Sequence, residues 1–311
     1  MINFRFHLAS LIAIFLALAL GVVVGAGVID RGVVDTLNNR LDSVERTSDR
    51  IKGENSQLRG ENGELTEAIG DLQCPAVADA LVAEDIGIIA VRGVDETAVN
   101  NTVAAAQCAG GTVTGKLWLE DKWALANDDD IAAMAQALGS SSKKPATLRA
   151  AAWKQLAERM QAPVPAGDTA TDVLATLQNA GFLKFEMVGD NGATMSQFPR
   201  RGASMLLAVG DDADVSDKVV TPAATAFVAA AVPLVVGQIY AGGQDVPARG
   251  AALDALRGST VGKLVSTVDD LDRPQGPAAA ALTLAALRQD PPQYGNYGLG
   301  DGLKQLPDTS Q

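Results

Sequence analysis

The chain has almost no histidine. Of its 311 residues one is a histidine, His7, and two are cysteines, Cys74 and Cys108. The large C-terminal part therefore lacks the imidazole that Ser-His-Asp and Cys-His hydrolases, HExxH metalloproteases and histidine-ligated zinc or copper sites require. We expect a protein that is not an enzyme and that has no cofactor and no catalytic or metal-ligating residues.

Aromatic and basic side chains are also scarce. Aromatic residues make up 4% of the chain, and 25 Lys and Arg stand against 37 Asp and Glu. The resulting formal net charge of −12 makes nucleic acid an unfavourable partner, because its backbone is negative too. The length is sufficient for one large domain or two small ones with a buried core.

One long apolar run is present, at residues 8–29, and it contains no charged side chain. It is long enough to cross a bilayer as a helix. We predict a retained single-pass anchor in the plasma membrane, with residues 1–7 as a short cytoplasmic tail and the large domain extracytoplasmic. A cleaved signal peptide is the alternative, because residues 24–26 resemble a cleavage site.

Small residues recur along this run. Ala17, Gly21 and Gly25 lie four positions apart, and the two glycines form a GxxxG pattern. Small residues at this spacing let two helices approach closely in a membrane, so the pattern predicts a packing face for a second spanning helix. Alternatively, Gly and Ala are simply common in spanning helices.

A heptad repeat follows within residues 30–74. Its d positions are all aliphatic and comprise Leu37, Val44, Ile51, Leu58, Leu65 and Leu72. Its a positions comprise Leu41, Ser48, Asn55, Asn62 and Ile69. Aliphatic d positions over this length predict a coiled coil, and Asn at a favours a parallel dimer in fixed register. We therefore predict a homodimer.

Flanking charges agree with a parallel dimer, because Arg40 would face Glu45 of the second chain and Glu54 would face Arg59. Four glycines in the repeat weaken the helix, each by about 1 kcal/mol relative to alanine. A weak seam with polar a positions could also accept a helix from another protein. Both interpretations remain open, a dimerising stalk and a surface for a partner helix.

The remaining chain, residues 75–290, alternates short apolar runs with helical patterns. We expect Pro75 to end the preceding helix, because proline cannot continue the helical hydrogen bonding. Strands are predicted at residues 86–91, 112–119, 183–188, 205–209, 233–238 and 265–268. Helices are predicted at residues 96–109, 129–138, 146–161, 170–180, 221–231, 248–256 and 277–287. This alternation predicts an α/β domain with a largely parallel sheet.

The first strand-to-helix turn, residues 92–97, has one glycine and an acidic pair. It matches neither GxGxxG nor a P-loop, so we expect a scaffold rather than a nucleotide-binding domain. Met134 and Met160 lie in predicted helices, and we expect them in the core.

The two cysteines have three possible fates. If the domain lies outside the membrane, Cys74 and Cys108 are expected to form a disulfide that ties the exit of the coil to the first helix of the domain. Two separate buried thiols are one alternative. A soft-metal site made of two thiolates is another.

Three acidic clusters occur, at residues 128–130, 211–214 and 269–272. We expect solvated or helix-capping roles for all three, because carboxylates near a helix start bind free amides. The third cluster follows a predicted strand, where a catalytic carboxylate could lie, so an enzyme is the alternative there. In the C-terminal region, residues 293–298 are expected to pack the tail, residues 291–311, onto the domain; a partner-docking loop is the alternative.

Residues 1–8, 14–22 and 25–27 resemble the actinobacterial copper-transporter family, as do residues 267–272, Gly276 and the YGNYG tail. The resemblance covers nearly the whole chain. The MctB-like branch of this family implies an envelope channel in copper efflux. The SteB-like branch implies a role in cell separation beside a SteA-like membrane protein, through contact with the coiled coil of an NlpC/P60-type peptidoglycan hydrolase.

One spanning segment and a helix-rich domain do not build a pore, and no cluster of His, Cys or Met is present to receive copper ligands. We therefore favour a membrane-anchored dimeric envelope protein that regulates a peptidoglycan hydrolase in cell separation. Copper transport or copper homeostasis is the alternative.

Overall fold

The computed structural model describes residues 4–161, 172–189, 194–210, 215–242, 248–300, 303–304 and 306–307. The chain divides into two units, Met1–Leu65 and Thr66–Gln311. The acidic cluster at residues 211–214 lies outside the described residues.

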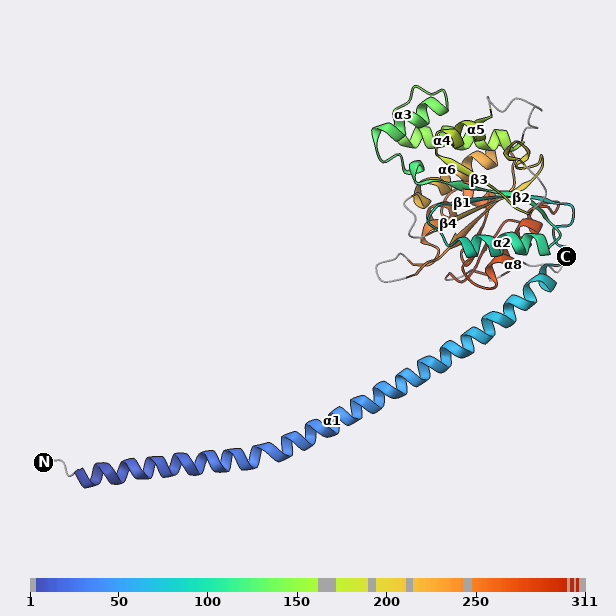
Figure 1. Ribbon diagram of the computed structural model, residues 1–311. Coiled ribbons are helices and arrows are strands. Elements are labelled where there is room, and N and C mark those ends of the chain that lie inside the picture. The colour runs from blue at the N-terminus through green and yellow to red at the C-terminus, as the bar shows by residue number, and fades with distance from the viewer. Residues whose placement is uncertain are drawn as a thin grey trace. The chain divides into compact units, whose positions relative to one another are not determined.

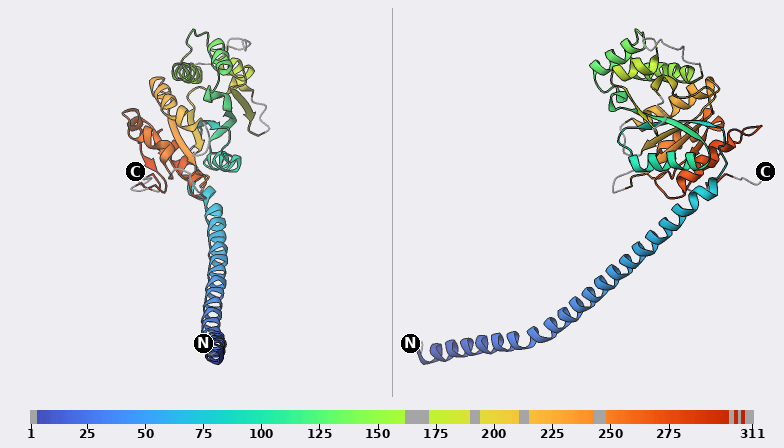
Figure 2. Two further views of the ribbon diagram at one scale, coloured as in Figure 1. Left: turned by 90° about the vertical axis from the view of Figure 1, so that its left-hand side faces the viewer. Right: turned by 45° about the vertical axis from the view of Figure 1, so that its right-hand side comes forward.

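Helix α1 (Phe4–Val77) is continuous through the apolar run and the heptad repeat (Figure 2). Its segment Phe4–Gly25 has 22 residues with a mean hydropathy of 2.7, and it is the one helix in the described part of the chain that is long and apolar enough to cross a membrane. Pro75 lies inside the last turn, so the expectation that the helix ends before this residue is wrong. Proline removes a single backbone donor, and the helix ends two residues later.

Within the described residues, the second unit contains a seven-stranded sheet in the order β3-β2-β1-β4-β5-β6-β7. The strands are β1 (Asp85–Val91), β2 (Thr112–Leu119), β3 (Leu183–Met187), β4 (Ser204–Gly210), β5 (Leu234–Ile239), β6 (Ser266–Val268) and β7 (Asn296–Tyr297). Neighbouring strands are parallel except for β2 and β3. The predicted α/β domain with a largely parallel sheet is therefore confirmed, and so is the strand predicted at residues 183–188, but its antiparallel direction and the short β7 were not predicted.

Helices cover both faces of this sheet (Figure 1). The α-helices are α2 (Glu96–Cys108), α3 (Asp128–Ala137), α4 (Pro145–Gln161), α5 (Val173–Asn179), α6 (Ser216–Ala229), α7 (Ala251–Arg257) and α8 (Gly276–Ala286). Short 3-10 helices are η1 (Asp121–Ala124), η2 (Met195–Gln197) and η3 (Val261–Leu264). Helices α2 and α8 lie on one face, and α3 to α7 pack on the other.

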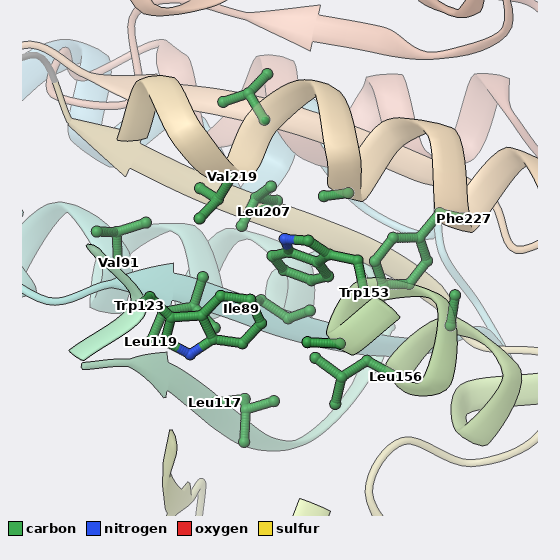
Figure 3. Packing of buried hydrophobic residues seen from close by; sticks show 14 of the residues in the cluster. Ile89, Val91, Leu117, Leu119, Trp123, Trp153, Leu156, Leu207, Val219 and Phe227 are labelled. Atoms are coloured by element: carbon green, nitrogen blue, oxygen red, sulfur yellow. The ribbon is translucent and has the colours of Figure 1, made fainter. Parts of the chain in front are cut away.

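The larger core lies between the sheet and helices α3 to α7. Trp153 of α4 is its centre, with ring centroids 5.2 Å from Trp123 and 5.9 Å from Phe227 (Figure 3). Aromatic pairs at such distances stabilise a core beyond the area they bury. Met134 and Met160 are buried in the same cluster, as predicted.

The second core lies between the sheet and helices α2 and α8. Helix α8 is built almost entirely of small buried residues, which let its backbone lie close to the strands. Val77, from the last turn of α1, and Leu81 are fully buried in this cluster. The end of α1 is therefore part of the folded second unit.

Strand β3 forms an outer edge of the sheet. The Phe185 N–H donates to Gln178 Oε1 of α5 at 2.9 Å, and Leu183 is buried. An outer strand normally presents such donors to solvent or to another chain. Here a side chain of the same domain satisfies one of them.

Candidate functional site

A stripe of exposed aliphatic side chains runs along the part of α1 that belongs to the first unit. We call it the α1 stripe; it comprises Leu37, Leu41, Val44, Ile51, Leu58 and Leu65. Their exposed fractions range from 46% to 66% in the single chain. Burying an aliphatic side chain gains about 1.5–3 kcal/mol, so a stripe of this length is a surface that a second helix would cover. The dimer itself remains a prediction.

The membrane segment presents an open face at its small residues. A Cβ atom placed on Gly21 or Gly25 would contact nothing within 4 Å beyond its own turn of helix. Ala17 lies one turn before Gly21 and is exposed as well. Packing of a second spanning helix on this face remains a prediction.

The last turns of α1 are joined to the α/β domain by covalent and polar contacts. A disulfide links Cys74 of α1 to Cys108 at the end of α2, with 5.0 Å between their Cα atoms. Gln73 Nε2 donates a hydrogen bond to the Pro274 carbonyl oxygen. Cys74 is exposed and Cys108 is half-buried. Solvent and small reagents therefore reach this disulfide from one side.

The third acidic cluster is buried, and the expectation that it is solvated or caps a helix is wrong. Asp269 and Asp270 have no exposed surface. Asp272 accepts two hydrogen bonds from Arg249, at 2.6 and 2.8 Å. These bonds raise the pKa of Arg249 above its usual value despite its partial burial. Arginine supplies a matching pair of donors, so the carboxylate is occupied on both oxygens.

Asp269 holds the C-terminal tail. Its carboxylate accepts from both terminal nitrogens of Arg257 at 3.2 Å and from the Leu299 amide at 2.8 Å. A side chain at Gly298, which has a φ of 128°, would collide with this carboxylate. Tyr297 is buried beside it on β7, whereas Tyr294 is exposed. The tail therefore packs on the domain through Tyr297, as expected.

Asp270 is the least compensated carboxylate of the cluster. Oδ2 accepts from Gln275 at 3.0 Å, and Oδ1 has no hydrogen-bond partner among the described residues. Burial raises the pKa of Asp270 to about 6, and the neighbouring Asp269 charge acts in the same direction. Asp270 therefore stays protonated at pH values where an ordinary aspartate is already ionised.

This arrangement favours a structural role for the cluster over a catalytic one. A catalytic carboxylate must reach a substrate, whereas Asp269 and Asp272 are engaged by arginines and by the backbone. Sequence reasoning missed Arg249 and Arg257, which contribute the opposite charge. No local signal could identify them, because they lie 23 and 12 residues from their partners.

The remaining predicted positions have local roles. Asp128 and Asp129 are exposed in the first turn of α3, as expected for the first acidic cluster, and the cap itself is Asn127, which accepts from the Asp130 amide at 2.8 Å. Asp95 caps α2 by accepting from the Thr97 amide at 2.8 Å. Within the described residues, no group of three or more His, Cys, Asp or Glu side chains is arranged to hold a metal ion.

Comparison with known proteins identifies the family. A family model described as "Copper transport outer membrane protein, MctB" matches residues 1–307. The chain is 27% identical over 327 aligned positions to proteins named Copper transporter MctB from Mycobacterium bovis and Mycobacterium tuberculosis, covering 98% of this chain and 99% of the relatives. These matches favour the copper alternative over hydrolase regulation. The chain belongs to the MctB copper transport family.

Proposed function

We propose that this protein acts in copper transport or copper homeostasis at the cell envelope. One observation carries the proposal. The model of a single family, whose description names copper transport, matches residues 1–307, from the apolar N-terminal run through the heptad repeat and the α/β domain to the tail. The relatives that share this arrangement over nearly their whole length are named as copper transporters. A match confined to the α/β domain would support the fold alone.

The protein is anchored in the plasma membrane by the N-terminal segment of α1, with the α/β domain outside. Two features support this topology. The segment Phe4–Gly25 is apolar over a spanning length. The Cys74–Cys108 disulfide suits an oxidising compartment and would not persist in a reducing cytoplasm.

Its mode of action is contact with other proteins, not catalysis and not chemistry on a bound cofactor. The α1 stripe pairs two copies in parallel, with Asn55 and Asn62 in the seam. The part of the chain that the structure describes has one helix of spanning length, and a single helix does not enclose a pathway for an ion. The dimer would therefore need further membrane proteins to form the pathway, and it would contribute to copper transport as one part of a larger membrane assembly.

Deletion of the gene in its own host tests the copper role. Growth across a copper series should stop at a lower concentration in the deletion strain, and the full chain should restore tolerance. A chain carrying Leu58→Glu in the α1 stripe should fail to restore it, while Ser56→Glu on the outer face of the same helix should succeed. Unchanged copper tolerance in the deletion strain would contradict the proposal.

A second candidate function is regulation of a peptidoglycan hydrolase in cell separation. The exposed α1 stripe favours it, because the stripe and the polar a positions beside it could accept the coiled coil of an NlpC/P60-type hydrolase, with a SteA-like membrane protein as co-partner. Chained, unseparated cells after deletion, at normal copper tolerance, would establish this function in place of the copper role. Microscopy of the same strains provides this measurement.

A further inference from the structure

We propose that Cys74 and Cys108, when their disulfide is reduced, bind one Cu(I) ion between their sulfur atoms. The inference rests on the proposed function for the choice of copper. The geometric part of the argument uses only the positions of Cys74 on α1 and Cys108 on α2.

The two cysteines lie close enough to bind one metal ion together. Their Cα atoms are 5.0 Å apart, one on the last turns of α1 and the other at the end of α2. A zinc–thiolate bond is about 2.3 Å long, and bonds from Cu(I) to thiolates are slightly shorter, so two such bonds hold the sulfur atoms less than about 4.6 Å apart. After reduction, rotation about the two Cα–Cβ bonds separates the sulfur atoms, while the Cα atoms stay close enough for one ion to bridge them.

The ligand set selects the ion. Thiolates are soft ligands and favour Cu(I), which is stable with two of them in a linear arrangement. Structural zinc requires four ligands, and the described residues contain no group of three or more His, Cys, Asp or Glu suited to a metal. A two-thiolate site therefore favours Cu(I) over the divalent ions.

Access is possible from solvent. Cys74 is exposed, whereas Cys108 is half-buried against the core that α2 and α8 form with the sheet. A small dithiol can therefore attack the disulfide by thiol–disulfide exchange. Two electrons and two protons pass from this dithiol to the two cysteine sulfurs, and the dithiol becomes a cyclic disulfide.

Copper binding then replaces protons. One Cu(I) ion binds to two thiols with release of two protons, which leaves an anionic bis-thiolate complex and no change of oxidation state. The ion links α1 to α2 again where the disulfide had joined them. Between these two linked states, the end of α1 is held by the Gln73–Pro274 hydrogen bond and by the buried Val77.

Titration of the full chain in detergent tests the site. The chain is reduced with dithiothreitol, desalted without oxygen and titrated with Cu(I) against the chromogenic chelator bathocuproine disulfonate. We expect the reduced chain to retain one Cu(I) and to develop near-ultraviolet thiolate–copper absorption. The oxidised chain, the reduced chain alkylated with N-ethylmaleimide, and the Cys74→Ser/Cys108→Ser chain should retain none.

The variants keep His7 and every methionine, so they control for copper bound elsewhere. The alkylated wild-type chain makes the test independent of whether the serine variant folds. Equal copper retention by the reduced and the alkylated chains would overturn the proposal, as would no retention by a reduced chain whose circular dichroism is unchanged. The copper tolerance of the deletion strain tests the proposed function separately, because neither result depends on the other.

Discussion

Asp269 and Arg257 form an ion pair at 3.2 Å in which the carboxylate is completely buried. The same carboxylate accepts the Leu299 amide of the tail, and Arg257 also donates to Thr267 Oγ1 at 2.9 Å. The pair therefore connects α7, β6 and the tail. Breaking a buried pair leaves the remaining charge without compensation, which costs more than the pair contributes as a whole.

Replacing Asp269 with Asn should destabilise the second unit by about 3–5 kcal/mol, because Arg257 would remain buried without a counter-charge. Urea unfolding of the full chain, followed by fluorescence of the buried Trp118, Trp123 and Trp153, provides the measurement. Asp254→Asn is the matched control, since Asp254 is exposed on α7. Equal unfolding midpoints for the two variants would show that the pair is not structural.

The second unit should become more stable as the pH falls from about 7.5 toward 5. The folded-state pKa of Asp270 is raised to about 6 from 3.8, so folding favours the protonated form. The cost of the buried charge is fully present above the folded pKa and is relieved as the pH falls from about 6 to the unfolded value of 3.8. About half of the total of about 3 kcal/mol is relieved by pH 5. Thermal unfolding at several pH values measures this dependence.

The variant Asp270→Asn isolates this group, because an amide mimics the neutral acid and does not titrate. Its unfolding temperature should change less than that of the wild type across the same range. His7, the one histidine of the chain, belongs to the first unit. The same pH dependence in both chains would contradict the role of Asp270.

Two copies of the chain should cross-link through position 58. In a parallel dimer, d positions of the two helices face each other, so Leu58→Cys should form an intermolecular disulfide under mild oxidation. Ser56→Cys, at an outer position of the same repeat, should remain largely uncross-linked. Non-reducing electrophoresis of membranes containing each variant gives the result. Comparable cross-linking of both variants would show that the chains collide at random and that no parallel coiled-coil dimer forms.

The membrane helices should also associate through Gly21. A Cβ atom on Gly21 would contact nothing within 4 Å beyond its own turn of helix, so the position is open in the single chain. Gly21→Ile should nevertheless weaken association of the isolated Phe4–Gly25 peptide, because close backbone approach would be lost. Val22→Ile serves as the control, and energy transfer between labelled peptides in bilayers reports association. Unaltered transfer for Gly21→Ile would exclude this face.

Most of the fold could be predicted because its elements carry strong local patterns. The apolar runs at β1, β2 and β4 and the small-residue helix α8 were expected close to where they occur. The direction of β3 could not be predicted, because it depends on how three helices return the chain from β2 to the sheet edge. Strand β7 has two residues, too few for a periodic signal.

The candidate site was predicted only in part, because some of its features follow from local sequence patterns and others from contacts between distant residues. The heptad pattern predicts the α1 stripe, since its period is local. What covers the stripe stays a prediction, because the structure contains one chain. The burial of Asp269 depends on Arg257 in a different element. Acidic residues after a strand are normally exposed to solvent. Here an arginine from helix α7 neutralises the carboxylate, so it can be buried.

The hydrogen bond from Phe185 to Gln178 has a consequence for a tethered protein. Anchoring to a membrane confines chains to two dimensions and raises the frequency with which their domains collide. Sheets with bare margins would then fuse and grow into aggregates. Gln178 occupies one donor of this margin from within the domain, which leaves one site fewer for pairing with the sheet of a second copy.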